Sequence, residues 1–87
     1  MDKTEYGKWM TWKQLKAFLV LARTLNYAHA ADELCLSQSA LSLSIKSLEE
    51  ELGGKLFKRN TRFVHLTHEG QALIPYAKKL LANWDDM

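Results

Sequence analysis

Near the start of the chain, apolar residues recur at helical spacing, at Leu15, Phe18, Leu19 and Ala22. Just before them, Thr11 stands three residues ahead of Gln14. This is the spacing of a capping box, in which each side chain bonds the backbone N–H of the other residue. The pattern therefore predicts a helix that begins at Thr11 and ends near Leu25, because Asn26 favours a break.

A short helix and a longer one are predicted next. The short helix covers about residues 28–34, and Tyr27 just before it is interpreted as an anchoring aromatic. A tight turn ends at Ser37, which is a natural cap for a helix over about residues 38–51. The core stripe of this longer helix consists of Leu41, Ile45, Leu48 and Leu52. Gly53 supplies its C-terminal stop.

The period of the pattern then changes from helical to strand-like. The runs Leu56-Phe57 and 63–66 flank residues 59–62, which we interpret as the tip of a β-hairpin. A two-stranded hairpin is marginal alone, so we expect it to pack on the helices. Thr67 is expected to cap a last long helix over about residues 68–86.

This last helix carries two neighbouring apolar stripes and an internal Pro75, which should bend it or remove one backbone bond. One stripe consists of Leu73, Tyr76 and Leu80, and the other of Ile74, Ala77, Leu81 and Trp84. One stripe can pack on the domain itself, but a small domain rarely leaves so much apolar surface to water. We therefore predict a homodimer through this helix. Its expected interface residues are Leu73, Ile74, Ala77, Leu80, Leu81 and Trp84. The alternative is a helix buried on both sides within one chain.

Composition limits the possible classes. The chain has 87 residues, 47% of them hydrophobic and 25% charged, which is typical of one small globular domain. Residues 1–10 are interpreted as a flexible N-terminal arm without the apolar core of a secretory signal. The longest apolar run, residues 17–22, is too short to span a bilayer, so we expect no membrane partner. A single Cys35 cannot form an internal disulfide, and we expect it to be buried or half-buried rather than a redox sensor.

Charge is small in total and uneven in distribution. The net charge is +2, but four cations and no acid lie in the predicted hairpin segment, at Lys55, Lys58, Arg59 and Arg62. An acidic triplet, residues 49–51, comes shortly before them. A charged run is usually only a solvated face, so its place in the fold decides its meaning.

The short helix, tight turn and capped helix describe a helix-turn-helix, and the hairpin adds a wing. The residues expected to face a DNA major groove are Ser37, Gln38, Ser39, Ser42, Leu43 and Lys46. The serines are small enough for close approach, Gln38 can form a bidentate bond with adenine, and Leu43 can contact a thymine methyl group. The cations Lys46, Lys58, Arg59 and Arg62 suit phosphate contacts, and Arg59 or Arg62 could enter a minor groove.

Several short motifs also follow one another in the order and at the spacing typical of a known family. They are Leu15, Phe18, Ala30-Ala31-Asp32-Glu33-Leu34, Ser37-Gln38-Ser39-Ala40-Leu41-Ser42, Ile45, Leu48-Glu49, Leu52-Gly53, Leu56-Phe57, Arg59, Arg62, Leu66-Thr67 and Gly70. Over residues 12–81 the chain resembles the DNA-binding domain of LysR-type transcriptional regulators. The resemblance implies a mainly α fold: a winged helix-turn-helix of three helices and a two-stranded hairpin over residues 11–66. A dimerisation linker helix would follow over residues 67–87.

The resemblance also implies a function. It implies binding to double-stranded operator DNA at a promoter. The expected location is the bacterial cytoplasm, at the nucleoid, and no cofactor is expected. His29 occupies a position near the DNA backbone in such regulators. The family often has Pro at the position of Ser39 and Arg or another polar residue at that of Leu43, so the target sequence is expected to differ. Relatives continue into a larger effector-sensing domain, which we expect in the full-length protein and which these 87 residues do not contain.

Other functions receive less support from the sequence. His29, His65 and His68 lack the three or four convergent ligands of a metal site, so we expect no metal. The serines have no His-Asp arrangement around them, so we expect no enzyme. The main rival is a small helical protein-interaction module without DNA binding, which the striped last helix and the low net charge would suit. The salt dependence of duplex binding distinguishes the two functions.

Overall fold

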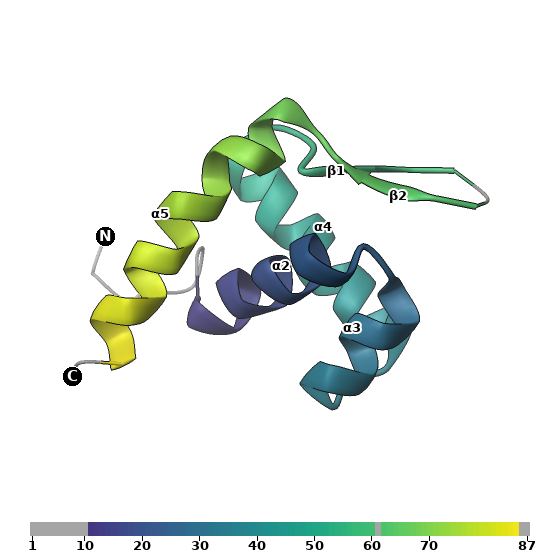
Figure 1. The fold of residues 1–87 in the computed structure, drawn as a ribbon, viewed down its shortest axis with the longest axis horizontal. Coiled ribbons are helices and arrows are strands. Elements are labelled where there is room, and N and C mark those ends of the chain that lie inside the picture. Colours follow the sequence, from purple (N-terminus) through teal and green to yellow (C-terminus); the bar gives the residue numbers. More distant parts are fainter. Residues whose placement is uncertain (1–10, 61, 86–87) are drawn as a thin grey trace.

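A computed structural model describes residues 11–60 and 62–85, the last three by their backbone alone. The predicted arm, residues 1–10, lies outside the described residues. In chain order, the elements are α2 (Trp12–Thr24), α3 (Tyr27–Leu34), α4 (Gln38–Leu52), β1 (Phe57–Arg59), β2 (Val64–Leu66) and α5 (His68–Asp85). Helix α2 contacts each of the other three described helices, and the hairpin projects from them (Figure 1). The fold is the mainly α winged helix-turn-helix with a following long helix that was predicted.

Local capping interactions begin α2 and α4 at the predicted positions. The Thr11 Oγ1 accepts the Gln14 N–H at 3.2 Å, and the Gln14 Oε1 accepts the Thr11 N–H at 3.0 Å, which completes the capping box. Leu25 ends α2 in a left-handed conformation with φ 52°. The Ser37 Oγ accepts the Ala40 N–H at 3.0 Å and so caps α4. Both caps satisfy backbone donors that the first turn of a helix leaves without partners.

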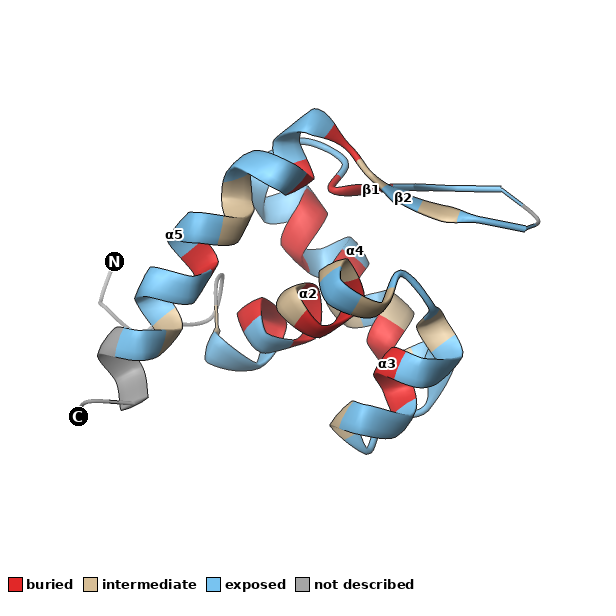
Figure 2. Cartoon of the chain, in the orientation of Figure 1, coloured by how far each residue is buried: buried red, intermediate tan, exposed pale blue. Residues whose placement is uncertain are grey.

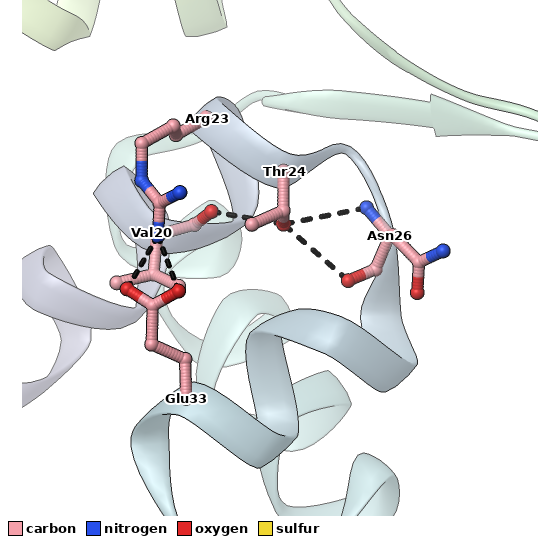
Figure 3. A network of polar contacts seen from close by, with 5 residues as sticks. All are labelled: Val20, Arg23, Thr24, Asn26 and Glu33. Atoms are coloured by element: carbon pink, nitrogen blue, oxygen red, sulfur yellow. Dashed lines mark hydrogen bonds and ion pairs between the residues drawn. The ribbon is translucent and has the colours of Figure 1, made fainter.

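A polar network joins α2 to α3 (Figure 3). The Thr24 hydroxyl donates to the Val20 carbonyl at 3.0 Å and accepts the Asn26 N–H at 3.4 Å. The Asn26 side chain in turn accepts the N–H of the third residue of α3 at 2.9 Å, so α3 begins one residue earlier than predicted. An ion pair between Arg23 and Glu33 bridges the two helices on the exposed side. Together these contacts fix the angle at which α3 leaves α2.

The core lies where α2, α4 and the base of the hairpin meet. The largest fully buried side chains are Phe18, Leu15, Leu21, Leu41, Leu48 and Leu56. The rings of Phe18 and Phe57 are 5.6 Å apart and tie α2 to β1. Ala30 and Ala31 are buried on α3, where their small side chains allow close contact with α2 and α4. Figure 2 shows buried segments on α2, α3 and α4, whereas β1 beyond its first residue is exposed.

The hairpin is antiparallel, and its strands differ slightly from the prediction. The paired residues are Phe57 with Leu66, Lys58 with His65 and Arg59 with Val64. Arg59 therefore belongs to β1 and not to the tip, because it is paired across the ladder. The Asn60 Oδ1 accepts the N–H of Arg62 at 2.8 Å and of Phe63 at 2.7 Å, and so closes the turn. This is the local side-chain bonding that makes asparagine favourable in turns.

Thr67 connects the hairpin to α5, and Gly70 in the first turn of α5 lies close to the loop before β1. The Thr67 Oγ1 accepts the Gly70 N–H at 3.0 Å, which caps α5 as predicted. The same hydroxyl donates to the Lys55 carbonyl at 2.6 Å. A Cβ atom on Gly70 would lie 2.3 Å from the Leu56 carbonyl oxygen, so the close approach of α5 to this loop requires glycine. Pro75 lies inside α5 without ending the helix.

Three of the predicted residue environments are wrong. Leu52 was expected in the core stripe of α4, but it is 42% exposed, because it is the last residue of that helix and lies at the edge of the core. Ala77 was expected at a dimer interface, but it is fully buried in the chain's own core. Its stripe neighbours Ile74 and Leu81 are half-buried against that core, because this is the stripe of α5 that packs inward. Cys35 was expected to be buried or half-buried, but it is exposed. It ends α3 in a left-handed conformation, φ 59°, in which its backbone caps the helix and its side chain stays outside the core.

Candidate nucleic-acid interface

The outer face of α4 carries the residues predicted to read DNA. Ser37, Gln38, Ser39, Leu43 and Lys46 are exposed and Ser42 is half-buried. Leu43, the apolar residue of this set, is 67% exposed. The buried stripe of α4 lies on the opposite side of the helix. The outer face therefore presents small and polar side chains, together with the apolar Leu43, to solvent.

Two open hollows lie between this helix face and the hairpin. The larger, of about 540 Å³, carries cations from α4, the following loop and β1, namely Lys46, Lys55, Lys58 and Arg59. The second, of about 480 Å³, extends over the first half of α4 and is lined by Gln38, Ser39 and Leu43. Tyr27, Ser42 and Arg59 line both hollows. The fold thus brings most of the predicted groove-facing residues and the cations of β1 to one side of the molecule.

Arg59 is held against α3 by an aromatic ring. Its guanidinium carbon lies 4.3 Å from the ring centroid of Tyr27, which is a cation–π contact. Burial raises the pKa of the Tyr27 hydroxyl, although the neighbouring Arg59 charge acts in the opposite direction. The hydroxyl is therefore a neutral donor at physiological pH. Sequence reasoning missed this pair, since nothing local in the pattern relates residues so far apart.

Glu49 attaches the hairpin to α4. It is only 8% exposed, and its Oε2 accepts the backbone N–H of Leu56 at 2.8 Å and of Phe57 at 3.3 Å. Its Oε1 also lies 3.7 Å from the Lys55 Nζ. Glu50 beside it is exposed, so the acidic triplet of the sequence divides into one structural carboxylate and two surface charges. Glu49 fixes where the cations of β1 lie relative to α4.

The other predicted contact residues lie apart from the hollows. Arg62 is exposed at the hairpin tip, and His29 is exposed on α3. Neither lines the two hollows. In the part of the chain that the structure describes, no group of three His, Cys, Asp or Glu residues could hold a metal ion. Likewise, none of the helices within residues 11–60 and 62–85 has the length and apolar character of a membrane span.

A separate apolar surface lies on the outer side of α5. Tyr76 is 67% exposed, Leu80 is 40% exposed, and Leu73 is half-buried. Beside them, a hollow of about 350 Å³ is also lined by Leu52 at the end of α4. The side chain of Trp84 lies outside the described residues. Leu73 packs partly against the core of its own domain, whereas Tyr76 and Leu80 leave much of their apolar surface exposed to solvent.

Comparison with sequence families and curated proteins identifies related chains. Residues 12–71 match the model of the bacterial regulatory helix-turn-helix proteins of the lysR family. The chain is 44% identical over 70 residues to the HTH-type transcriptional regulator HdfR of Yersinia enterocolitica, and 46% identical over 70 residues to HdfR of Yersinia pestis. In both comparisons the match covers 80% of this chain and 24% of the relative. The chain therefore spans about a quarter of the length of these relatives.

Solved structures share the fold. A complex of the BenM DNA-binding domain with catB site 1 DNA superimposes with a TM-score of 0.83 and 42% identity, covering 90% of this chain and 87% of that one. Oxidised OxyR of Corynebacterium glutamicum gives a TM-score of 0.85 and 37% identity, covering 87% of this chain and 23% of OxyR. These similarities agree with the helices, hairpin and long last helix described above.

Proposed function

The chain belongs to the LysR family of bacterial regulatory helix-turn-helix proteins, a family of regulators and not of enzymes, and from this premise we propose that it binds double-stranded DNA sequence-specifically. One observation carries the proposal: polar residues of the outer face of α4 and Arg59 of β1 border the same two hollows, and Lys58 lines the larger one. The BenM domain, 42% identical to this chain, is a further support, because its crystal structure is a DNA complex.

In the proposed complex, the N-terminal half of α4 enters the major groove, which is about 12 Å wide. Ser37, Ser39 and Ser42 allow the helix to approach closely. Gln38 forms a bidentate bond with the N6 and N7 of an adenine, and Leu43 contacts a thymine methyl group. The exposure of Leu43 supports this role, since an apolar side chain on this face otherwise remains in water.

The basic residues around α4 supply the contacts that do not read sequence. Lys46, Lys58 and Arg59 bind phosphates on either side of the groove, and His29 contacts the backbone from α3. Arg62 at the hairpin tip contacts a phosphate or enters the adjacent minor groove. Two of these cations, Lys58 and Arg59, lie on β1, whose position Glu49 fixes through backbone hydrogen bonds.

The assembly proposed for DNA binding is a homodimer through α5. Tyr76 and Leu80 are exposed there, and Leu73 and Leu52 extend the same apolar surface. Contact with a second α5 would remove this surface from water, which stabilises association. A twofold pair would place its two α4 helices in successive major grooves, with half-sites about one helical turn, or a small multiple of it, apart.

The chain is proposed to be the DNA-binding part of a longer regulator. It spans 24% of HdfR. In this interpretation an effector-binding domain follows α5 in the full-length protein, and the protein acts in the cytoplasm at the nucleoid. No cofactor takes part in DNA binding itself.

Duplex binding measured against salt tests the proposal. Each phosphate that a cation neutralises releases counterions, so log K should fall linearly with log salt, with a slope near −0.9 per phosphate contact. With several contacts, affinity for a random-sequence duplex should fall steeply as salt rises. The rival function, a protein-interaction module, is favoured by the apolar surface of α5 and by the low net charge of +2. It would be supported instead if no duplex were retained above background even at low salt.

A further inference from the structure

The contact between Tyr27 and Arg59 carries an inference that rests on the proposed DNA-binding function and goes beyond it. We propose that Tyr27 is a positioning residue that holds the Arg59 guanidinium beside α4, ready to bind a DNA phosphate. The guanidinium carbon lies 4.3 Å from the Tyr27 ring centroid. Both residues line both hollows beside the outer face of α4.

The geometry leaves the hydrogen-bond donors of Arg59 available. A guanidinium is planar, with its five N–H donors directed along its edges. The guanidinium lies over the Tyr27 ring, and contact with this one side chain cannot engage all five donors. A phosphate oxygen that enters the hollow can therefore accept from Arg59 without breaking the stack. Lysine has no such plane, so a lysine at this position would keep the charge but lose the orientation.

The ring is a fixed support for the guanidinium. Tyr27 begins α3 and is partly buried against the core, whereas Arg59 lies on the exposed end of β1. The stack therefore joins the hairpin to the helix-turn-helix. Restricting a flexible arginine before binding lowers the entropy that is lost on binding.

No carboxylate neutralises Arg59 in the described part of the chain. The ion pairs there are Arg23 with Glu33 and Lys55 with Glu49, and Arg59 belongs to neither. Glu49 lines the larger hollow, but its oxygens are directed to Lys55 and to backbone N–H groups. The positive charge held by Tyr27 thus remains available to an anion.

A double-mutant cycle on duplex binding tests the inference. The 87-residue chain is titrated into a labelled random-sequence duplex at low and moderate salt. Tyr27→Leu should weaken binding about fivefold, the size of a typical cation–π contribution. Tyr27→Phe keeps the ring face and should stay within about twofold of wild type. In the Arg59→Ala background, Tyr27→Leu should have no further effect, because its partner is already absent.

A second pair of variants tests the inference even if Tyr27→Leu disturbs folding. Arg59→Lys leaves Tyr27 in place and keeps the charge, so it should weaken duplex binding while the domain still unfolds in one cooperative thermal transition. In the Tyr27→Leu background, the same substitution should have a smaller effect. Equal losses from Tyr27→Leu with and without Arg59 would overturn the inference. If wild type itself bound no duplex, the proposed function would fail, and the two failures are therefore distinguishable.

Discussion

Removing the Glu49 carboxylate tests how the hairpin is attached to the recognition helix α4. The carboxylate is 8% exposed and accepts the N–H groups of Leu56 and Phe57 at 2.8 and 3.3 Å. Glu49→Ala leaves both donors without this partner. We expect the substitution to lower stability and also to weaken duplex binding, because the cations of β1 lose their fixed position beside α4.

The expected magnitude follows from these two bonds. A hydrogen bond to a charged group contributes about 1.5–3 kcal/mol, and the 3.3 Å bond should be the weaker one. The free energy of unfolding should therefore fall by about 2–4 kcal/mol. For a domain of this size, each kcal/mol corresponds to about 4–8 °C in Tm, so a decrease of at least about 8 °C is expected. Glu49→Gln keeps an acceptor oxygen for both N–H groups but removes the charge, and should therefore lose about half as much.

Urea denaturation followed by circular dichroism measures this effect. Glu50→Ala is the matched control, since Glu50 is the exposed neighbour on the same helix, and it should change stability by less than about 0.5 kcal/mol. The interpretation of Glu49 as the attachment point would be refuted if Glu49→Ala were as stable as Glu50→Ala. It would also be refuted if Glu49→Ala lost stability but kept the full affinity of wild type for duplex DNA.

Three further predictions address α5 and the hairpin. Gly70→Ala would place a Cβ 2.3 Å from a backbone oxygen and should lower the free energy of unfolding, measured by urea denaturation, by about 2 kcal/mol or more. Gly54→Ala is the control and should not lower it, because no atom lies within 4 Å of the added Cβ. Arg62→Ala should weaken binding to specific and random duplexes alike and reduce the salt slope by about one; unchanged affinity would remove Arg62 from the interface. Leu80→Glu combined with Tyr76→Glu should give a monomer in sedimentation, and a persistent dimer would mean that this face of α5 is not the interface.

The parts of the fold that the sequence predicted well are those set by local interactions. Thr11, Ser37 and Thr67 were identified as caps because a capping bond spans only three residues. Periodicity correctly predicted the buried positions Leu41, Ile45 and Leu48 of α4, whereas Leu52 at the helix end is exposed. The tip of the hairpin was placed correctly around Asn60, since its side chain bonds the turn that it begins.

The features that sequence analysis missed depend on tertiary contacts. Arg59 was assigned to the tip, but pairing with Val64 places it in β1, over the ring of Tyr27. Glu49 was grouped with two surface acids, because the two N–H groups that bind it come from the following loop and strand. Ala77 was assigned to a dimer interface, because periodicity gives two stripes on α5 without showing which one faces the core.

The central claim is that this chain reads double-stranded DNA with α4, as a dimer. Selection of bound duplexes from a random pool, followed by sequencing, tests it most directly. The account predicts enrichment of a symmetric site whose half-sites lie about one helical turn, or a small multiple of it, apart. Substitution of Gln38 or Leu43 should change the preferred bases within each half-site without changing their spacing. A bound pool with no enriched sequence, or no bound pool at all, would contradict the account.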